Sequence, residues 1–194
     1  KVRVHLPIPK VYEQVSNVEI HASNPEITYV APFDAPQRTV YFETELKENQ
    51  EFMVDYSFDY HVNYVELDPA KVSEEQPDFC LEEQTPHIVF TPYLRELRDE
   101  LAGDETNPII LARRFYDFVT TKVMYSFMRE YFTIECIPEY CAINLKGDCG
   151  VQALLFITLC RMSGIPARWQ SGLYVTKYYT GCHDWAQFYV APYG

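Results

Sequence analysis

The sequence predicts an α+β fold in which an antiparallel β-sandwich precedes a domain of helices followed by strands. Two observations carry this prediction. In the first third of the chain, short runs alternate apolar and polar residues between turn residues. In the second half the apolar residues recur at helical spacing, and a Pro-rich, acidic stretch separates the two patterns. We therefore expect a sandwich domain at 1–66, a linker at 67–92 and a second domain at 93–194.

The expected sandwich has about five strands, one face of each sheet being buried and the other wet. Its clearest alternating runs are Val2–Leu6, Val18–Ile20, Thr39–Thr44 and Phe52–Phe58. The histidines of this region are isolated, so no catalytic group is expected there.

Three helices and two strands are expected in the second domain. The first helix spans Tyr93–Ala102, and the second begins at Pro108 after Asn107 as its N-cap. The third runs from Gly150 to about Ser163 and is apolar nearly all round, which predicts a buried helix. The strands are expected at Ala167–Val175 and Trp185–Val190.

Charge and composition exclude several classes of protein. The net charge is −12, and most of the excess acid lies in the first 90 residues, which argues against a nucleic-acid partner. No apolar run reaches the roughly 20 residues of a membrane span. The chain starts at a lysine without a signal peptide, so we expect a processed product or a piece of a longer protein. Compartment and oligomeric state stay open.

The six cysteines are too few and too scattered for a disulfide framework. The one close pair, Cys136 and Cys141, lacks a second pair that would complete a zinc site. We expect neither a metal nor a cofactor.

Cys149 is the strongest candidate for a catalytic residue. It lies between Gly147-Asp148 and Gly150, at the start of the buried helix. The N–H groups and dipole of a helix N-terminus stabilise a thiolate, and glycine neighbours let a substrate carbonyl approach closely. Its own backbone N–H is then a natural donor to an oxyanion. Cys160, on the apolar body of the same helix, is expected to be inert packing.

His183 is the candidate base for this thiol. It lies at the start of a strand in Gly181-Cys182-His183-Asp184-Trp185, and the second half of the chain otherwise holds only His87.

Three segments resemble bacterial transglutaminase-like proteins. They are Gly147-Asp148-Cys149 before an apolar helix, Leu159–Arg168 with its Gly164-Ile165-Pro166, and His183-Asp184-Trp185. The resemblance spans roughly residues 93–194, and the β-rich N-terminal domain is also similar to those that precede such cores. It implies a papain-like core with Cys149 as nucleophile and His183 as base. It also matches Arg168, Trp185 and Tyr125 to family positions; we interpret Arg168 as a buried pairing group, Trp185 as a core residue and Tyr125 as structural.

The acid of the family's triad is expected on a strand some fifteen residues after the histidine, and the chain stops eleven residues after His183. Asp184 is a poor substitute, because adjacent residues of a strand point to opposite faces. We therefore expect a core truncated at its C-terminus, whose activity as a fragment is in question.

The resemblance implies thiol-dependent acyl transfer at amide bonds of a protein or peptide substrate. Transfer to water gives a protease or deamidase, and transfer to an amine gives a cross-linker; the sequence favours hydrolysis only by its bacterial character. The alternative is a non-catalytic module that keeps this fold and binds peptides or cell-surface partners. A peptide-N-glycanase-like enzyme is set aside because its paired Cys-x-x-Cys is missing.

Overall fold

The structure is a computed structural model that describes residues 1–46 and 48–194. The chain forms two compact units, Lys1–Val65 and Glu66–Gly194. Helices and antiparallel sheets are both well represented, so the α+β prediction is confirmed. Within the described ranges, none of the helices combines the length and the apolar character needed to cross a bilayer.

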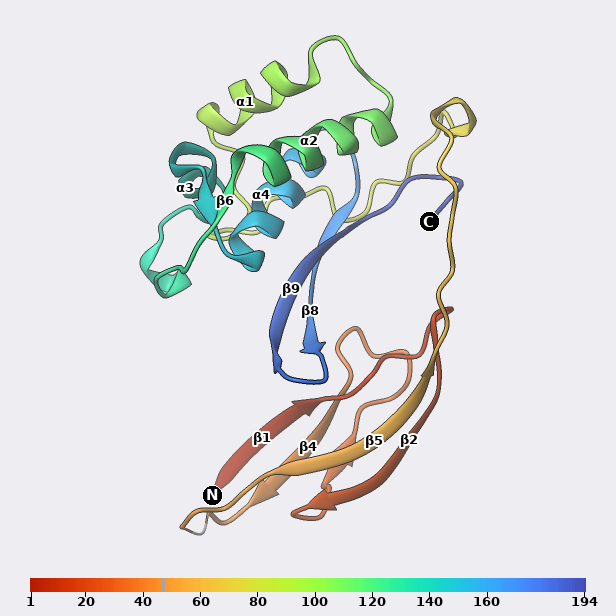
Figure 1. Cartoon of the computed structure of the whole chain (residues 1–194), viewed down its shortest axis with the longest axis vertical. Helices are drawn as coiled ribbons and strands as arrows, with labels where there is room; N and C mark the ends of the chain where they lie inside the picture. Colours follow the sequence, from red (N-terminus) through yellow and green to blue (C-terminus); the bar gives the residue numbers. More distant parts are fainter. Residues whose placement is uncertain (47) are drawn as a thin grey trace. The chain divides into compact units, whose positions relative to one another are not determined.

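The first unit contains two antiparallel sheets. One has the strand order β1 (Val2–Pro7), β4 (Thr39–Thr44), β3 (Tyr29–Val30). The other pairs β2 (Val15–Asn24) with β5 (Met53–Tyr60), and its register shifts twice along β2 (Figure 1).

The two sheets of this unit share one small apolar core. Val40 and Phe42 of β4 are fully buried at its centre. Ile20 and Val54, from the opposing sheet, pack against them. The alternation read from the sequence therefore corresponds to inward and outward faces, as expected for a sandwich.

The segment expected to be a linker lies in the second compact unit. It contains a short 3-10 helix, Pro69–Lys71, whose Pro69 carbonyl accepts a hydrogen bond of 2.8 Å from the Asn107 side chain. Ile88 is 3% exposed and belongs to the main core. These residues pack against the helices of the second unit.

Two of the predicted helices begin where their caps indicate. In α1 (Pro92–Ala102) the Thr91 hydroxyl accepts from the N–H of Leu94. In α2 (Pro108–Lys122) the Asn107 side chain accepts from two N–H groups of the first turn. Capping side chains of this kind satisfy N–H groups that the helix itself leaves free.

A further helix, α3 (Ile137–Asn144), was not predicted. It has eight residues, and no side chain caps it at Cys136. Pro138 and Glu139 in its first turn are the local marks of its start, and its apolar residues do not lie along one face, so periodicity gives no signal.

The predicted buried helix is α4 (Cys149–Met162), and it is the central element of the second unit. It contacts α1, α2 and α3 and both strands of the following hairpin (Figure 1). Every residue from Ala153 to Arg161 is buried. The Arg161 guanidinium is satisfied by the carbonyls of Ala167 and Glu82, at 2.8 and 2.7 Å.

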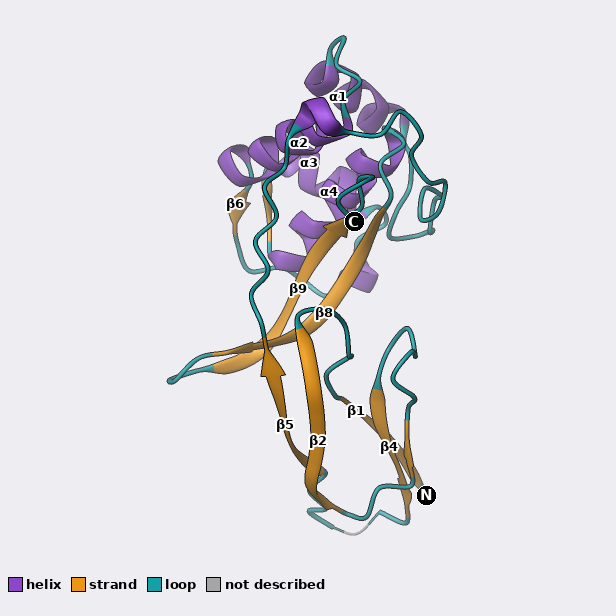
Figure 2. Ribbon diagram, turned by 90° about the vertical axis from the view of Figure 1, so that its right-hand side faces the viewer, coloured by secondary structure: helices purple, strands orange, loops and turns teal. Residues whose placement is uncertain are grey.

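The hairpin that follows consists of β8 (Ala167–Val175) and β9 (Thr180–Phe188), paired in register over nine residue pairs (Figure 2). β8 has the predicted bounds. β9 begins five residues before the predicted Trp185, because the glycine and polar residues at 181–184 hide its start in the sequence.

Two interpretations of single residues in this hairpin were wrong. Arg168 is exposed, and its guanidinium donates to the Gln187 side chain at 3.1 Å. Trp185 is 41% exposed and lies over Gly172 rather than in the core. Both side chains are on the face of the hairpin that points away from the α4 core.

Candidate active site

Cys149 is the first residue of α4, and its side chain is half-buried. Asp148 caps the helix, because its Oδ1 accepts from the N–H of Val151 at 3.1 Å. The same oxygen accepts from the hydroxyl of Tyr131 at 2.5 Å. The residue before the thiol is thereby held from two directions, and the thiol lies at the positive end of the helix dipole.

Gly150, the residue after the thiol, is packed closely by two aromatic side chains. A Cβ at this position would lie 2.6 Å from a ring carbon of Trp169 and would also clash with the Tyr131 hydroxyl. Only a residue without a side chain lets the two rings approach the first turn of α4 this closely. The glycine after Cys149 thus has a packing reason that does not depend on chemistry.

Tyr125 is connected to the start of α4 by a short parallel strand pair. Strand β6 (Met124–Tyr125) pairs in parallel with β7 (Lys146–Gly147), and Tyr125 is the partner of Gly147. This pairing places Tyr125 beside the start of α4. Partial burial raises the pKa of the Tyr125 phenol, and the neighbouring Cys149 raises it further.

The Asp184 side chain of β9 lies next to Cys149. The thiol donates a long hydrogen bond of 4.0 Å to its Oδ2. The other carboxylate oxygen accepts from the Ser171 hydroxyl at 2.6 Å, and that hydroxyl accepts from the indole N–H of Trp169 at 2.7 Å. A chain of hydrogen bonds therefore runs from Trp169 to the thiol.

Tyr131 lies among these groups. Burial raises the pKa of its phenol well above the ordinary value, and the hydrogen bond to Asp148 and the nearby charges of Asp148, Cys149 and Asp184 act in the same direction. The Tyr131 hydroxyl consequently remains a hydrogen-bond donor to Asp148 across the working range of pH.

The structure does not bring His183 to Cys149. The imidazole lies against Tyr174 and Trp185, with ring centroids 5.8 and 6.5 Å away. The reason is that successive side chains of β9 point to opposite faces. Phe188 packs on Phe156 of α4, with the two ring centroids 5.9 Å apart. Asp184 lies four residues before Phe188 in the strand and therefore shares the face that points to α4. His183 lies on the opposite face, and the expected thiol and imidazole pair is not formed in this register.

The other cysteines of α3 and α4 are less suited to reaction. Burial raises the pKa of Cys141 to about 12, and it raises that of Cys160 further. Both side chains are fully buried, as expected for Cys160. Cys149 is the half-exposed thiol of α4, whereas Cys160 is inert packing.

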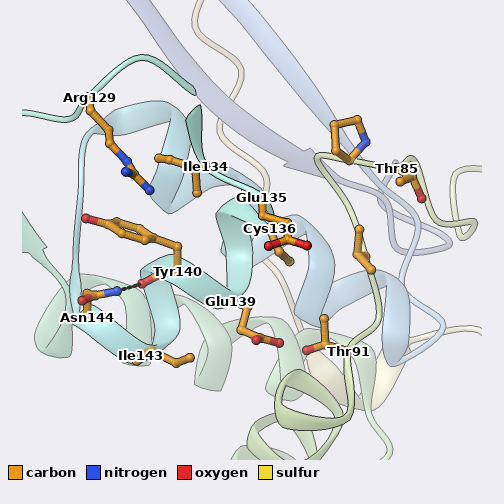
Figure 3. Close-up of a pocket in the computed structure, with 12 residues that line it drawn as sticks. Thr85, Thr91, Arg129, Ile134, Glu135, Cys136, Glu139, Tyr140, Ile143 and Asn144 are labelled. Atoms are coloured by element: carbon orange, nitrogen blue, oxygen red, sulfur yellow. Dashed lines mark hydrogen bonds between the residues drawn. The ribbon is translucent and has the colours of Figure 1, made fainter. Parts of the chain in front are cut away.

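A cavity of about 620 Å³ lies next to α3 (Figure 3). Glu135, Glu139 and Tyr140 line it, and Arg129 stacks over the Tyr140 ring at 5.6 Å. Neither Cys149 nor Asp184 lines this cavity. It is therefore separate from the thiol site.

Sequence reasoning set Asp184 aside as a substitute for the triad acid, and it missed Ser171 and Tyr131. The signal for Asp184 was present: Ala186 and Phe188 are the apolar, core-facing residues of the strand, and Asp184 continues their period of two. Ser171 follows as its cross-strand partner. Tyr131 lies in a loop and a single 3-10 turn, so no periodicity could have found it.

The comparisons with known proteins agree with this architecture. A crystal structure from Cytophaga hutchinsonii, described as a "Putative Cysteine Protease", superposes with a TM-score of 0.62 and 16% sequence identity, over 97% of this chain and 68% of that one. Among curated proteins none matches the sequence significantly. The family model of the transglutaminase-like superfamily matches residues 95–194, which is half of the sequence. The chain belongs to the transglutaminase-like superfamily.

Proposed function

We propose that the protein catalyses thiol-dependent acyl transfer at amide bonds, with Cys149 as the nucleophile. The observation that supports this most directly is the half-exposed thiol at the first residue of a buried helix. Asp148 and Tyr131 fix that helix start, and Gly150 lets the rings of Tyr131 and Trp169 pack against it. Membership in the transglutaminase-like superfamily and the name of the Cytophaga hutchinsonii protein favour the same chemistry.

His183 is proposed as the base, and it needs a local change to act. Asp184 and His183 are consecutive, so one extra residue bulged into β9 between His183 and Phe188 would exchange their faces. The outer half of the hairpin opposes such a change weakly, since Leu173 and Val175 are 48% and 67% exposed. The Phe156–Phe188 contact can stay in place while His183 turns toward the thiol.

The reaction then proceeds in two steps. His183 takes the proton of the Cys149 thiol as the sulfur forms a bond to the amide carbon, and the C–N bond breaks while His183 delivers that proton to the departing nitrogen. Water, having lost a proton to His183, attacks the acyl-enzyme and releases the acid and the thiol. We favour hydrolysis, because the half-exposed sulfur is open to water; an amine in place of water would give a cross-link.

The test uses the full chain with a glutamine-containing protein substrate such as casein. Ammonia release, new N-termini and incorporation of a labelled amine distinguish deamidation, proteolysis and cross-linking. C149A should abolish all three. H183A should lower the rate at least a hundredfold, and added imidazole should restore part of it, whereas the matched variant H87A should be unaffected.

A second candidate is a non-catalytic binding module that keeps this fold. It is favoured by one observation: a carboxylate, not an imidazole, lies next to the thiol at 4.0 Å. Under this alternative H183A changes nothing and C149A retains full binding of the partner. Turnover that is lost in C149A and rescued by imidazole in H183A would exclude it.

A further inference from the structure

The segment 126–136 connects β6 to α3 (Figure 1) and is hydrogen-bonded at two points to the residues just before the thiol. The N–H of Ser126 donates to the carbonyl of Gly147 at 3.1 Å. The Tyr131 hydroxyl donates to the carboxylate of Asp148 at 2.5 Å. Gly147 and Asp148 immediately precede Cys149 in the chain. Two hydrogen bonds therefore fix this segment beside the start of α4.

The same segment is also anchored in the core of the second unit. Met128 and Ile134 are buried there among the helices. Between them the 3-10 turn Tyr131–Thr133 is closed by the N–H of Ile134, which donates to the Tyr131 carbonyl at 3.0 Å. Buried side chains and a closed turn limit local opening of a segment. The side chains that it presents to solvent are therefore held in defined positions.

Two of these solvent-facing side chains are phenylalanines. Phe127 is 95% exposed and Phe132 is 85% exposed, which makes them the most exposed phenylalanines of the described chain. Phe127 directly follows Ser126, and Phe132 directly follows Tyr131, so each ring is attached next to one of the two hydrogen-bonded residues. The adjoining strand Met124–Tyr125 is exposed as well. Large apolar side chains gathered at one place on a surface mark a contact site, whereas single ones are common.

An extended substrate bound at the thiol can reach both rings. Consecutive Cα atoms are about 3.8 Å apart, so each phenylalanine is one such step from a residue bonded to Gly147 or Asp148. An extended peptide covers about 3.3–3.6 Å per residue. Side chains within about five positions of an amide held at Cys149 can therefore meet this segment. A second copy of the chain is a less suitable partner, because a net charge of −12 makes identical chains repel.

We propose that Phe127 and Phe132 are specificity-determining residues that bind apolar side chains flanking the reactive amide. The substrate class is then a protein or peptide segment with leucine, phenylalanine or similar residues on either side of that amide. This inference rests on the proposed acyl-transfer function and adds to it the sequence that the site selects. The two rings take no part in bond making, and they act by losing contact with water when the substrate covers them.

The experiment compares two peptides that each contain a single glutamine. In one peptide leucine and phenylalanine flank the glutamine on both sides, and in the other serine takes their places. Mass spectrometry registers deamidation, cleavage and incorporation of an added amine alike, so kcat and KM are obtained whichever acceptor the acyl-enzyme uses. The full chain is compared with F127S/F132S, and C149A gives the background.

We expect kcat/KM of the wild type to be at least about tenfold higher for the apolar peptide. In F127S/F132S this value should fall about ten- to a hundredfold, mainly through a higher KM, because substrate binding loses the burial of two rings. The value for the serine peptide should stay within about twofold, so the preference disappears. The matched control is Y64S, since Tyr64 is an 88% exposed aromatic residue of the other compact unit and should leave the preference unchanged.

Three results would overturn the inference while leaving the acyl-transfer function intact. The first is equal turnover of the two peptides by the wild type, and the second is a preference that survives in F127S/F132S. The third is an equal loss for both peptides, which would mean that the rings support the site or an association between copies. Absence of any Cys149-dependent turnover rejects the acyl-transfer function itself, and the inference with it.

Discussion

The two faces of the β8–β9 hairpin carry different polar groups for one physical reason. The core face holds Asp184, bonded to Ser171, and continues into Phe188 against Phe156. The outer face holds His183, packed with aromatic rings. Two consecutive residues, either suited to assist a thiol, are thus separated by the pleat of a strand rather than by distance along the chain.

This comparison shows what selects the partner of Cys149. The position of the thiol is fixed by α4. The group that faces it depends on the register of β9, and the contact between Phe156 and Phe188 holds that register in place. An in-register hairpin presents a carboxylate, and a register changed by one residue presents an imidazole. Substitutions can test the contact between Phe156 and Phe188, the groups around the thiol, and the polar pairs of each face.

The largest expected effect comes from removing the anchor of the core face. F156A deletes a ring that is 8% exposed and contacts Phe188, and should lower the free energy of unfolding by about 3–5 kcal/mol. Y174A, on the outer face at 51% exposure, should cost under about 1 kcal/mol. Urea denaturation followed by circular dichroism measures both. Equal costs would show that the two faces do not differ in packing.

The fold could be predicted from the sequence wherever local signals are strong. Asn107 and Asp148 mark helix starts, and the apolar run of α4 marks a buried helix, because caps and burial leave direct traces in residue type. The short α3 has neither a side-chain cap nor an apolar stripe, so it escaped. Cys149 could be placed at a helix start for the same local reason.

The partner of Cys149 was harder, because it depends on which face of β9 packs against α4. The scarcity of histidines in the second half and the family resemblance both favoured His183, whereas the alternation of Ala186 and Phe188 favoured Asp184. In the structure the apolar period decides the face. Tyr131 reaches the site from an irregular loop, and tertiary packing alone places it there.

The second prediction concerns Tyr131, which touches the α4 side of the site. Y131F removes the donor to Asp148 and should lower the free energy of unfolding at pH 7 by about 1–2 kcal/mol. The folded protein holds the pKa of this phenol above its unfolded value, so the unfolded state releases the proton first as pH rises. The advantage of the wild type over Y131F should therefore shrink above about pH 10.

Urea unfolding at pH 7 and at pH 10.5 measures this change, and Y174F serves as the outer-face control. A difference between wild type and Y131F that stays constant or grows at the higher pH would contradict the raised pKa of Tyr131.

The third prediction concerns the charge that lies next to Cys149 in the absence of substrate. At 4.0 Å the Asp184 charge opposes a Cys149 thiolate. Even with the dielectric constant of bulk water this repulsion amounts to about 1 kcal/mol, so D184N should speed alkylation of Cys149 at pH 7 at least about fivefold. H183N should leave the resting alkylation rate unchanged, because the imidazole lies on the other face.

Iodoacetamide kinetics with mass-spectrometric assignment of Cys149 measure both variants. A slower alkylation in H183N, with no acceleration in D184N, would contradict this prediction. It would mean that the imidazole reaches the thiol without substrate, in a hairpin whose β9 register is shifted by one residue.

The smallest expected effect compares the polar cross-strand pairs of the two faces. On the core face Ser171 donates to Asp184 and accepts from Trp169, so S171A removes two hydrogen bonds. We expect a cost of about 1 kcal/mol in the free energy of unfolding. On the outer face the single bond from Arg168 to Gln187 is exposed, and R168A should cost under about 0.5 kcal/mol. Urea denaturation resolves the two values when both variants are measured beside the wild type.

The same serine also allows the carboxylate to be tested as a positioned group. Combining S171A with D184N should give less than the sum of the single effects on the alkylation rate, because Ser171 acts on the thiol only by holding Asp184. Strict additivity would mean that Asp184 keeps its place beside Cys149 without Ser171. In that case the backbone register of β9, rather than the hydrogen bond across the hairpin, determines which group faces the thiol.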